Sequence, residues 1–288
     1  RQGKIDKDIF RRFRLQHGAY GSRMTDDYSM IRIKAPAGQI YPHQLRKLAQ
    51  LSESFSIGSA HVSTRQSIQL HWVVLEDVSE VMRGLAEVGM TSREACGNSV
   101  RNVMCSPLAG ICSNAAFDAT PFAFAITKFF LRNPLSQNLP RKFKFNFTCC
   151  EKHGMARMVD VGLIPQTREV DGCVQRGFKI FLGGGLGNKS FVGHQLEEFT
   201  PEEDLLYTSI AVIRIFDRLG NRKNLARNRM RYLVDEMGWE NFQNTILKER
   251  AVMRATQSII VKLDIDDSAT EIKKSISISE ESGAPNTD

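Results

Sequence analysis

Three segments of the sequence alternate apolar side chains with cationic or hydrogen-bond-donating ones. They are residues 30–34, residues 60–75 and residues 142–147. Successive side chains of a β-strand point to opposite faces, so each segment predicts a strand with one face in a core and a donor face opposite. The donor faces would carry Arg32 and Lys34 in the first strand, Ser63, Arg65, Gln69 and His71 in the second, and Lys142, Lys144 and Asn146 in the third.

These donor faces contain no carboxylate. A half-solvated antiparallel sheet is the ordinary explanation of a polar face, but such a face usually mixes charges because opposite charges across strands stabilise it. Cations without counter-charges are better explained by a bound anion. The whole chain points the same way, since 39 Lys+Arg against 32 Asp+Glu leave a formal net charge of +7, which favours an anionic partner.

The elements that must position these faces form two groups along the chain. In the first group, strands at 30–34 and 60–75 alternate with helices at 42–55 and 78–88, a pattern typical of a compact α+β unit with an open sheet. The second group is expected to contain helices at 121–131, 200–219, 224–236 and 239–253 and strands at 142–149 and 177–182. We therefore predict an N-terminal arm at 1–22, domains at 23–92 and 93–262, and a linker or disordered tail at 263–288.

Composition excludes several classes of protein. With 42% hydrophobic and 25% charged residues, the chain is not collagen-like, fully disordered or a coiled coil. No apolar run approaches the roughly 20 residues that span a bilayer, and no signal peptide opens the chain, so no membrane partner is expected. The six cysteines are unevenly spaced, and the pair Cys149-Cys150 is adjacent. This is not the spacing of a secreted disulfide scaffold, so we expect a cytoplasmic protein.

Five ordered motifs resemble those of the sulfite/nitrite reductase hemoprotein family. They are residues 30–34 (MIRIK) with Pro36 and Gly38, residues 63–71 (STRQSIQLH), 100–105 (VRNVMC), 139–144 (LPRKFK) and 183–187 (GGGLG). The resemblance extends from about residue 10 to residue 262. It implies an α+β fold in which a ferredoxin-like half-domain at 23–92 is followed by an α/β siroheme-domain repeat at 93–262. It also implies siroheme, an iron tetrapyrrole with a rim of carboxylates, bridged to a 4Fe-4S cluster.

The resemblance assigns roles to the donor residues. The positions that would contact the siroheme are Ser63, Arg65, Gln69, His71 and Asn102. The positions that would surround the open coordination site of the iron, and act in catalysis, are Arg32, Arg101, Lys142 and Lys144. Cations there would hold an oxyanion by charge-assisted hydrogen bonds and supply protons as its oxygens leave as water.

The Lys-Phe-Lys sequence at 142–144 bears on the substrate. In the family it resembles, members that prefer nitrite tend to have Asn at the position of Lys144, and members that prefer sulfite keep the second lysine. Sulfite carries more negative charge near neutral pH, so a second cation suits it. The sequence therefore favours six-electron reduction of sulfite to sulfide, with reduction of nitrite to ammonia as the alternative.

The cysteines do not match the ligands of the family's cluster. Those ligands form C-x5-C and C-x3-C pairs in the second half of the complete polypeptide, whereas Cys105 and Cys112 form C-x6-C here. The histidines at positions 17, 43, 153 and 194 have no ligand-like spacing and are interpreted as surface or structural residues. We therefore expect no metal ligand in this chain, and we expect it to be the N-terminal half of a longer enzyme that supplies the cluster thiolates from its other half.

Other features allow alternatives. The segment 183–187 lacks the G-x-G-x-x-G spacing and the Lys-Ser/Thr of a P-loop, which disfavours nucleotide binding. Residues 222–231 hold five cations and no acid, which fits either a solvated helix face or a docking patch for an acidic electron donor such as ferredoxin or a flavoprotein. A non-catalytic basic binding module, for example one that binds RNA, is an alternative of another class. The chain lacks an RNP-type aromatic signature, so no nucleic-acid partner is expected.

Overall fold

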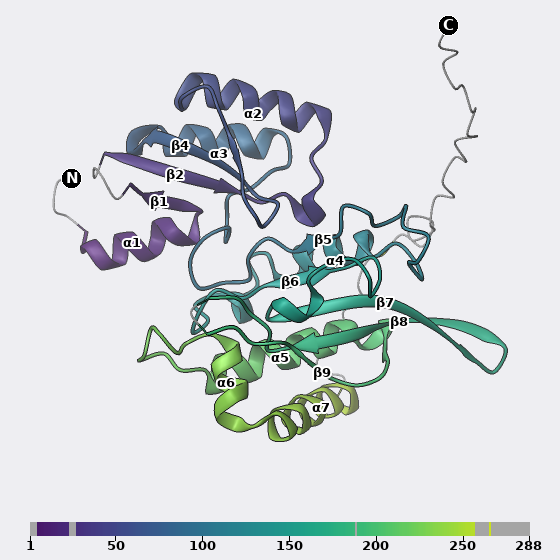
Figure 1. Ribbon diagram of the computed structural model, residues 1–288. Coiled ribbons are helices and arrows are strands. Elements are labelled where there is room, and N and C mark those ends of the chain that lie inside the picture. The colour runs from purple at the N-terminus through teal and green to yellow at the C-terminus, as the bar shows by residue number, and fades with distance from the viewer. Residues whose placement is uncertain (1–4, 23–26, 188, 257–264, 266–288) are drawn as a thin grey trace, which may run out of the picture.

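The computed structural model describes residues 5–22, 27–187, 189–256 and 265 (Figure 1). Apart from Ile265, the linker or tail predicted at 263–288 lies outside the described residues. The described chain contains two β-sheets, each with its own apolar core. The first sheet lies near the N-terminus of the chain, and the second lies beneath it in Figure 1.

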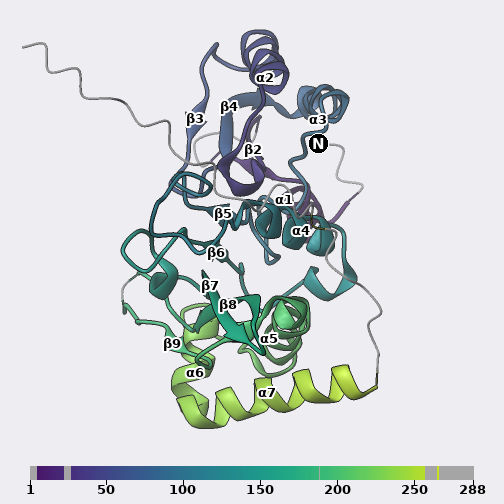
Figure 2. The same cartoon turned by 90° about the vertical axis from the view of Figure 1, so that its right-hand side faces the viewer.

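The first sheet is antiparallel and has four strands in the order β1-β2-β4-β3. The strands are β1 (Ala19–Gly21), β2 (Tyr28–Ile33), β3 (His61–Val62) and β4 (Ile68–Val74). Helices α2 (Pro42–Phe55) and α3 (Val78–Glu87) cover one face of this sheet (Figure 2). In β2 the predicted alternation is observed, because Ile31 and Ile33 are fully buried in the core while Arg32 lies on the other face and is half-buried.

The segment predicted as an N-terminal arm holds two regular elements. Helix α1 (Lys7–Gln16) begins where the Asp6 side chain accepts hydrogen bonds from the backbone N–H groups of Asp8 and Ile9. Strand β1 follows and pairs with β2, and its Ala19 is buried in the core of the first sheet. The arm prediction is therefore wrong for residues 19–21. A three-residue strand has too little sequence pattern to be recognised without its partner strand.

The long strand predicted at 60–75 is instead a hairpin. The chain reverses at residues 63–67, where the Ser63 backbone N–H donates to the Ser67 carbonyl at 2.8 Å and Gln66 has a φ of +54°. The alternation of sides therefore does not continue from β3 into β4. A bulge at Trp72, with a φ of +62°, interrupts it again. As a result Val62 and Trp72 are exposed, whereas an unbroken strand over 60–75 would place both on the core face with Ile68 and Leu70.

The second sheet has six strands. Five follow the order β10-β8-β7-β6-β5, and β9 also pairs with β8. The strands are β5 (Met104–Cys105), β6 (Phe145–Phe147), β7 (Val161–Val170), β8 (Cys173–Leu182), β9 (His194–Gln195) and β10 (Thr200–Pro201). The three strands β5, β6 and β7 are parallel, and β7 and β8 form a ten-residue antiparallel hairpin. Strand β7 was not predicted from the sequence, and the strand predicted at 142–149 is shorter than expected.

Four helices pack around the second sheet. They are α4 (Thr120–Phe130), α5 (Leu205–Leu219), α6 (Met230–Met237) and α7 (Trp239–Ala255). Short 3-10 helices occur at η1 (Pro36–Gly38), η2 (Leu75–Asp77), η3 (Pro134–Ser136), η4 (Ala156–Met158) and η5 (Glu202–Asp204). Two predicted helices begin later than expected, because β10 and η5 precede α5 and turns occupy the chain before Met230. None of the helices in the described ranges is long and apolar enough to cross a membrane.

The hairpin turn of the first sheet docks onto the second sheet. The Arg65 guanidinium donates from Nη2 to the carbonyls of Asn102 at 2.6 Å and Phe145 at 3.1 Å. Beside it, Gln66 Nε2 donates to the Cys105 carbonyl at 2.8 Å. Asn102 Nδ2 donates back to the carbonyls of Ala35 at 2.8 Å and Arg65 at 3.1 Å. These bonds bring the donor faces of the two sheets to one junction.

Candidate functional site

Strand β6 positions two lysines at this junction. Phe143, Phe145 and Phe147 are fully buried in the core of the second sheet. Because neighbouring side chains of an extended chain alternate, Lys142 and Lys144 point away from that core and are half-buried. The phenylalanines thus fix the backbone, and the lysines occupy the face that remains.

The pKa values of both lysines show how crowded with cations this face is. Burial, together with the positive charges of Arg101, Arg229, Arg141 and Arg32, lowers the pKa of Lys142 to about 8. Burial and the cations Arg229, Arg65 and Lys142, opposed by the carboxylate of Asp160, lower the pKa of Lys144 to about 8. Each lysine feels cations from both sheets, so the predicted cationic residues do converge.

Arg101 is buried and Arg65 is half-buried. Desolvation lowers the pKa values of both guanidiniums, that of Arg65 to about 10. Arg101 donates from Nε and Nη2 to the Gly97 carbonyl at 3.0 and 2.8 Å, and from Nη1 to the Ala95 carbonyl at 3.0 Å. These bonds tie down the loop before residue 100. Arg101 therefore adds positive charge to the junction, but three of its donor bonds are committed to the backbone.

Arg32, Gln69 and His71 lie on the first sheet. Arg32 and Gln69 are register partners on β2 and β4, and the Arg32 guanidinium lies over the Tyr20 ring at 5.4 Å. Partial burial lowers the pKa of His71, as do the nearby His61 and Arg32. His71 is therefore held toward its neutral form, in which one ring nitrogen accepts and the other donates.

Ser63 and Asn102 shape the junction. Ser63 Oγ lies 2.6 Å from Ser67 Oγ inside the hairpin turn and also accepts from the Arg65 backbone N–H at 3.3 Å. Asn102 is 3% exposed, and its Nδ2 atom donates hydrogen bonds to the carbonyls of Ala35 and Arg65. These bonds support structural roles for both residues, and their predicted contact with a cofactor stays a prediction.

The junction contains buried polar atoms that lack partners among the described residues. They are the Nε atoms of Arg32, Arg65 and Arg229 and the Oδ1 atom of Asn102. An orphaned buried donor costs about 1–3 kcal/mol, and cations crowded together repel. An anion with many carboxylates would accept hydrogen bonds from the three guanidinium Nε donors and neutralise the charge, whereas the Asn102 Oδ1 atom is itself an acceptor. The residues present therefore fit siroheme.

Two buried carboxylates, which were not among the predicted site residues, lie beside these cations. Asp160 is 1% exposed and accepts from Arg229 Nη2 at 3.0 and 2.9 Å. Glu94 is fully buried with one oxygen 3.8 Å from Lys34 Nζ. The cations of the junction are therefore partly compensated. Arg229 was not proposed as a site residue, and its proximity to Lys142 and Lys144 emerges only from the fold.

The basic segment 222–231 is not one helix face. Arg222 pairs with Asp217, Arg227 with Asp235 and Glu236, and Arg229 with Asp160. Arg231 is 6% exposed and donates to the Leu186 carbonyl at 3.1 Å beside the glycine-rich loop. Most of these cations are thus engaged in ion pairs or hydrogen bonds within the chain.

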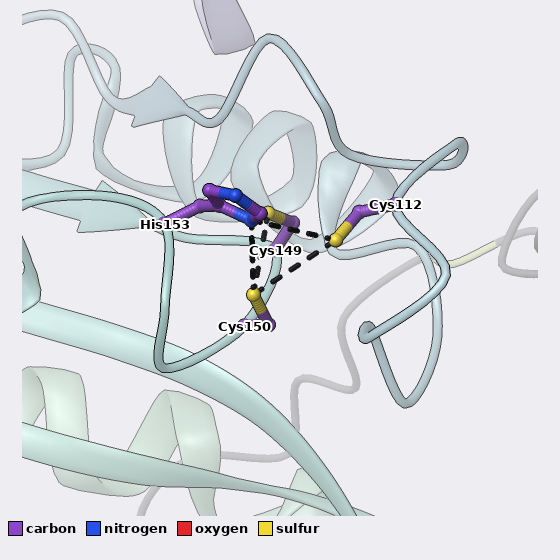
Figure 3. A group of neighbouring side chains, drawn as sticks. All are labelled: Cys112, Cys149, Cys150 and His153. Carbon is purple, nitrogen blue, oxygen red and sulfur yellow. Dashed lines mark hydrogen bonds between the residues drawn. The ribbon is translucent and has the colours of Figure 1, made fainter.

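A second group of chemically capable side chains lies at the far end of β6. The thiols of Cys112, Cys149 and Cys150 meet the ring of His153 in the loop after this strand (Figure 3). All four ligand atoms lie within 4.8 Å of one another. The cysteine and histidine spacings predict no metal ligand, so this group emerges only from the structure. A signal was nevertheless present, because Cys150-x2-His153 is a spacing that lets two side chains share one ion.

Comparison with known proteins agrees with this architecture. Residues 20–88 match the family described as "Nitrite/Sulfite reductase ferredoxin-like half domain". Residues 96–253 match the family described as "Nitrite and sulphite reductase 4Fe-4S domain". The predicted α+β fold with a ferredoxin-like half-domain is thereby confirmed.

Curated relatives carry both substrate names. An assimilatory ferredoxin-dependent nitrite reductase of Haloferax mediterranei is 34% identical over 78% of this chain and 40% of its own length. A sulfite reductase [ferredoxin] of Mycolicibacterium paratuberculosis is 31% identical over 85% of this chain and 46% of its own length. The chain thus spans less than half the length of these relatives.

A solved structure of the Mycobacterium tuberculosis NirA protein superposes with a TM-score of 0.78 at 27% identity, covering 86% of this chain and 48% of that one. A dissimilatory sulfite reductase I structure shares the fold at 13% identity and a TM-score of 0.64. The family matches cover more than half of the sequence, in the order in which the two sheets occur. The chain belongs to the nitrite and sulfite reductase family.

Proposed function

We propose that this chain forms the siroheme- and oxyanion-binding part of a sulfite reductase that reduces sulfite to sulfide with six electrons. The observation that carries the proposal is the convergence of cations from both sheets on Lys142 and Lys144, whose pKa values are each lowered to about 8. Such a site gains free energy when an anion enters it, because the anion relieves the repulsion among the cations.

Arg65, Gln69, His71, Ser63 and Asn102 are the residues that would hold the siroheme. The Nε donor of Arg65 supports this assignment, because it is buried and lacks an acceptor among the described residues. Siroheme, when bound, supplies the iron and the redox chemistry of the reaction.

Lys142, Lys144, Arg32 and Arg101 are the residues that would act on the oxyanion. A lysine with a pKa of about 8 gives up its proton more readily than an ordinary lysine, so each Nζ can donate a hydrogen bond and then a proton near neutral pH. The guanidiniums of Arg32 and Arg101 stabilise negative charge on the bound anion. The protein's part is thus binding, orientation and proton supply.

Nitrite is the alternative substrate, because the relatives include nitrite reductases of Haloferax mediterranei and Arabidopsis thaliana. Lys144 is the residue that favours sulfite over nitrite in this proposal. The electron donor is proposed to be an acidic protein such as ferredoxin, which the names of the relatives and the net charge of +7 support. A reducing cytoplasm is proposed as the compartment, in keeping with six free cysteines.

The experiment that tests the function is visible spectroscopy of the siroheme-loaded protein. We expect tetrapyrrole absorption in the red and a change of these bands when sulfite is added. Lys142→Met should weaken the sulfite response. Lys179→Met is the matched control, because that lysine pairs with Glu151 on the surface. Absence of tetrapyrrole binding, or equal effects of the two substitutions, would contradict the proposal.

A further inference from the structure

The group formed by Cys112, Cys149, Cys150 and His153 is separate from the cationic junction. Cys112 Sγ lies 3.8 Å from Cys150 Sγ, and Cys149 Sγ lies 4.0 Å from Cys150 Sγ. His153 Nδ1 lies 3.3 Å from Cys150 Sγ and 3.7 Å from Cys112 Sγ. The four side chains therefore form one close group, with all ligand atoms within 4.8 Å of one another (Figure 3).

These separations are those of ligands on one tetrahedral ion. Zinc binds thiolate sulfur at about 2.3 Å and imidazole nitrogen at about 2.0–2.1 Å, which places tetrahedral ligand atoms about 3.5–3.8 Å apart. The four distances given above lie close to this range. Three cysteines and one histidine also form one of the common ligand sets of structural zinc.

A 4Fe-4S cluster does not fit the same four residues. Its thiolates bind four different irons at the corners of a cube, so they point at a body of several atoms and stand well apart. Here all four ligand atoms lie within 4.8 Å of one another. Within the described ranges, no other group of three or more metal-ligating side chains comes together.

Apolar packing does not account for the burial of these thiols. Cys112, Cys149 and Cys150 form a small buried cluster of their own, with Ala115 as the partly buried neighbour packed against it. The local backbone instead favours convergence, because Cys150 and His153 are bridge partners across a tight turn. Cys112 arrives from a separate loop after β5, held by its backbone N–H to the Leu108 carbonyl at 2.9 Å.

An ion can reach this group from solvent. His153 is exposed, and a cavity of about 230 Å³ is lined by Cys150, His153 and Arg157 among others. The three thiols are therefore buried, while the exposed His153 keeps the group accessible to an ion from solvent.

We propose that Cys112, Cys149, Cys150 and His153 bind one divalent metal ion of the zinc type in a closed tetrahedral site. Four protein ligands leave no position for substrate, so the ion is structural. It would fasten the loop that carries Cys112 to the turn that follows β6. This site goes beyond the proposed reductase function and does not depend on it.

The first test is the metal content of the purified chain, measured by mass spectrometry under reducing conditions. We expect about one zinc per chain, and a cobalt-substituted sample should show the absorption bands of tetrahedral thiolate coordination. X-ray absorption at the zinc edge should give three sulfur ligands and one nitrogen ligand. None of these readouts requires siroheme or sulfite, so the result is independent of the reductase proposal.

Variants then identify the ligands. Cys150→Ser should remove the zinc, whereas Cys173→Ser should keep it, because Cys173 is an exposed cysteine outside the group. His153→Ala should weaken zinc binding by at least about 100-fold, since loss of a mere second-shell partner already costs about 10–100-fold. His153→Cys should retain the metal. Because His153 is exposed, its substitution leaves no cavity, and circular dichroism should confirm that both variants fold.

Three results would overturn the site. One is a protein without bound metal whose three thiols react freely. Another is a disulfide between Cys112 and Cys150 in protein kept under reducing conditions. The third is iron in place of zinc, with a cluster spectrum that disappears in Cys150→Ser.

Discussion

Lys142 and Lys144 are the residues whose chemistry depends most on their neighbours. On an isolated strand each would have the ordinary lysine pKa of about 10.4. Burial and the cations of the junction lower both to about 8. The charge that would hold an anion is therefore lost within a pH range in which an exposed lysine stays protonated.

Anion binding should consequently depend on pH. Both lysines are charged below pH 8 and lose their protons as the pH rises through about 8, so the affinity for sulfate, whose own charge is constant, should be highest below pH 8 and fall above it. Isothermal titration calorimetry from pH 6.5 to 9.5 measures this. The double variant Lys142→Arg with Lys144→Arg should flatten the profile, since arginine stays charged. An unchanged profile in that variant would contradict the assignment.

Lys144→Asn should alter the substrate preference of the siroheme-loaded enzyme. Removing one of two adjacent cations should reduce kcat/KM for sulfite by about 10-fold or more, the scale of a lost charge-assisted hydrogen bond of about 1.5–3 kcal/mol. The loss for nitrite should be smaller. Steady-state kinetics with both substrates and one electron donor measures the ratio, and equal losses would argue against sulfite as the preferred substrate.

The residue types on the faces of the site could be predicted from the sequence, whereas the contacts between residues far apart in the chain could not. The Phe/Lys alternation at 142–147 is visible from sequence because a strand has a fixed period of two. Asp160 and Arg229 are 69 positions apart, so no local pattern connects them. The thiols of Cys112 and Cys150 are likewise brought together only by the turn after β6 and the loop after β5.

At the scale of elements, strand β7 shows what a pattern cannot reveal. It contains Gly162 and Pro165, residues that are poor indicators of a strand. Gly162 is nevertheless required, because a Cβ atom there would lie 1.8 Å from the Ala156 carbonyl oxygen of η4. The close approach of η4 to β7 therefore depends on the missing side chain.

Gly162→Ala should destabilise the protein strongly. The added methyl group meets backbone, which cannot rotate away as a flexible side chain can, so the loss should reach or exceed the 1–3 kcal/mol that is roughly typical of overpacking. Urea unfolding measures the change in the free energy of unfolding. Gly172→Asn at the tip of the β7–β8 hairpin is the matched control, because no atom lies within 4 Å of a Cβ there and asparagine tolerates its φ of +76°. Similar effects of both substitutions would contradict the argument.

The hairpin formed by β3 and β4 was wrongly predicted as one long strand at 60–75. Its turn residues, Ser63, Gln66 and Ser67, are weaker turn signals than glycine or proline, so the segment reads as one long strand. The alternation of faces deduced from that strand was wrong for Val62 and Trp72. Arg65 nevertheless lies at the junction, because the turn itself points there.

At the scale of the whole molecule, the α+β architecture and the approximate positions of most helices could be anticipated from periodicity and from the ordered motifs. The docking of one sheet on the other could not, since it depends on side-chain bonds to backbone carbonyls. Asn102 illustrates this. Its amide nitrogen contacts the carbonyls of Ala35, Arg65 and Gln66, all from the first part of the chain.

Asn102→Ala should therefore loosen the two parts from each other. Three buried carbonyls would lose a donor, at a cost of about 1–3 kcal/mol, and thermal unfolding should broaden or separate into two transitions. Differential scanning calorimetry measures this. Asn241→Ala, at an exposed position of α7, serves as the control and should leave the transition sharp. A single sharp transition in Asn102→Ala would show that other contacts dominate the interface.

The turn at 63–67 has a consequence for how the holoprotein assembles. Arg65 both fastens the two sheets and keeps an unpartnered Nε at the junction. Any ligand that occupies that atom also restrains the guanidinium against Asn102 and Phe145. Binding of a polycarboxylate and strengthening of the contact between the two sheets are then thermodynamically linked. Proteases should therefore cut the ligand-free protein more readily at this contact than the ligand-bound protein.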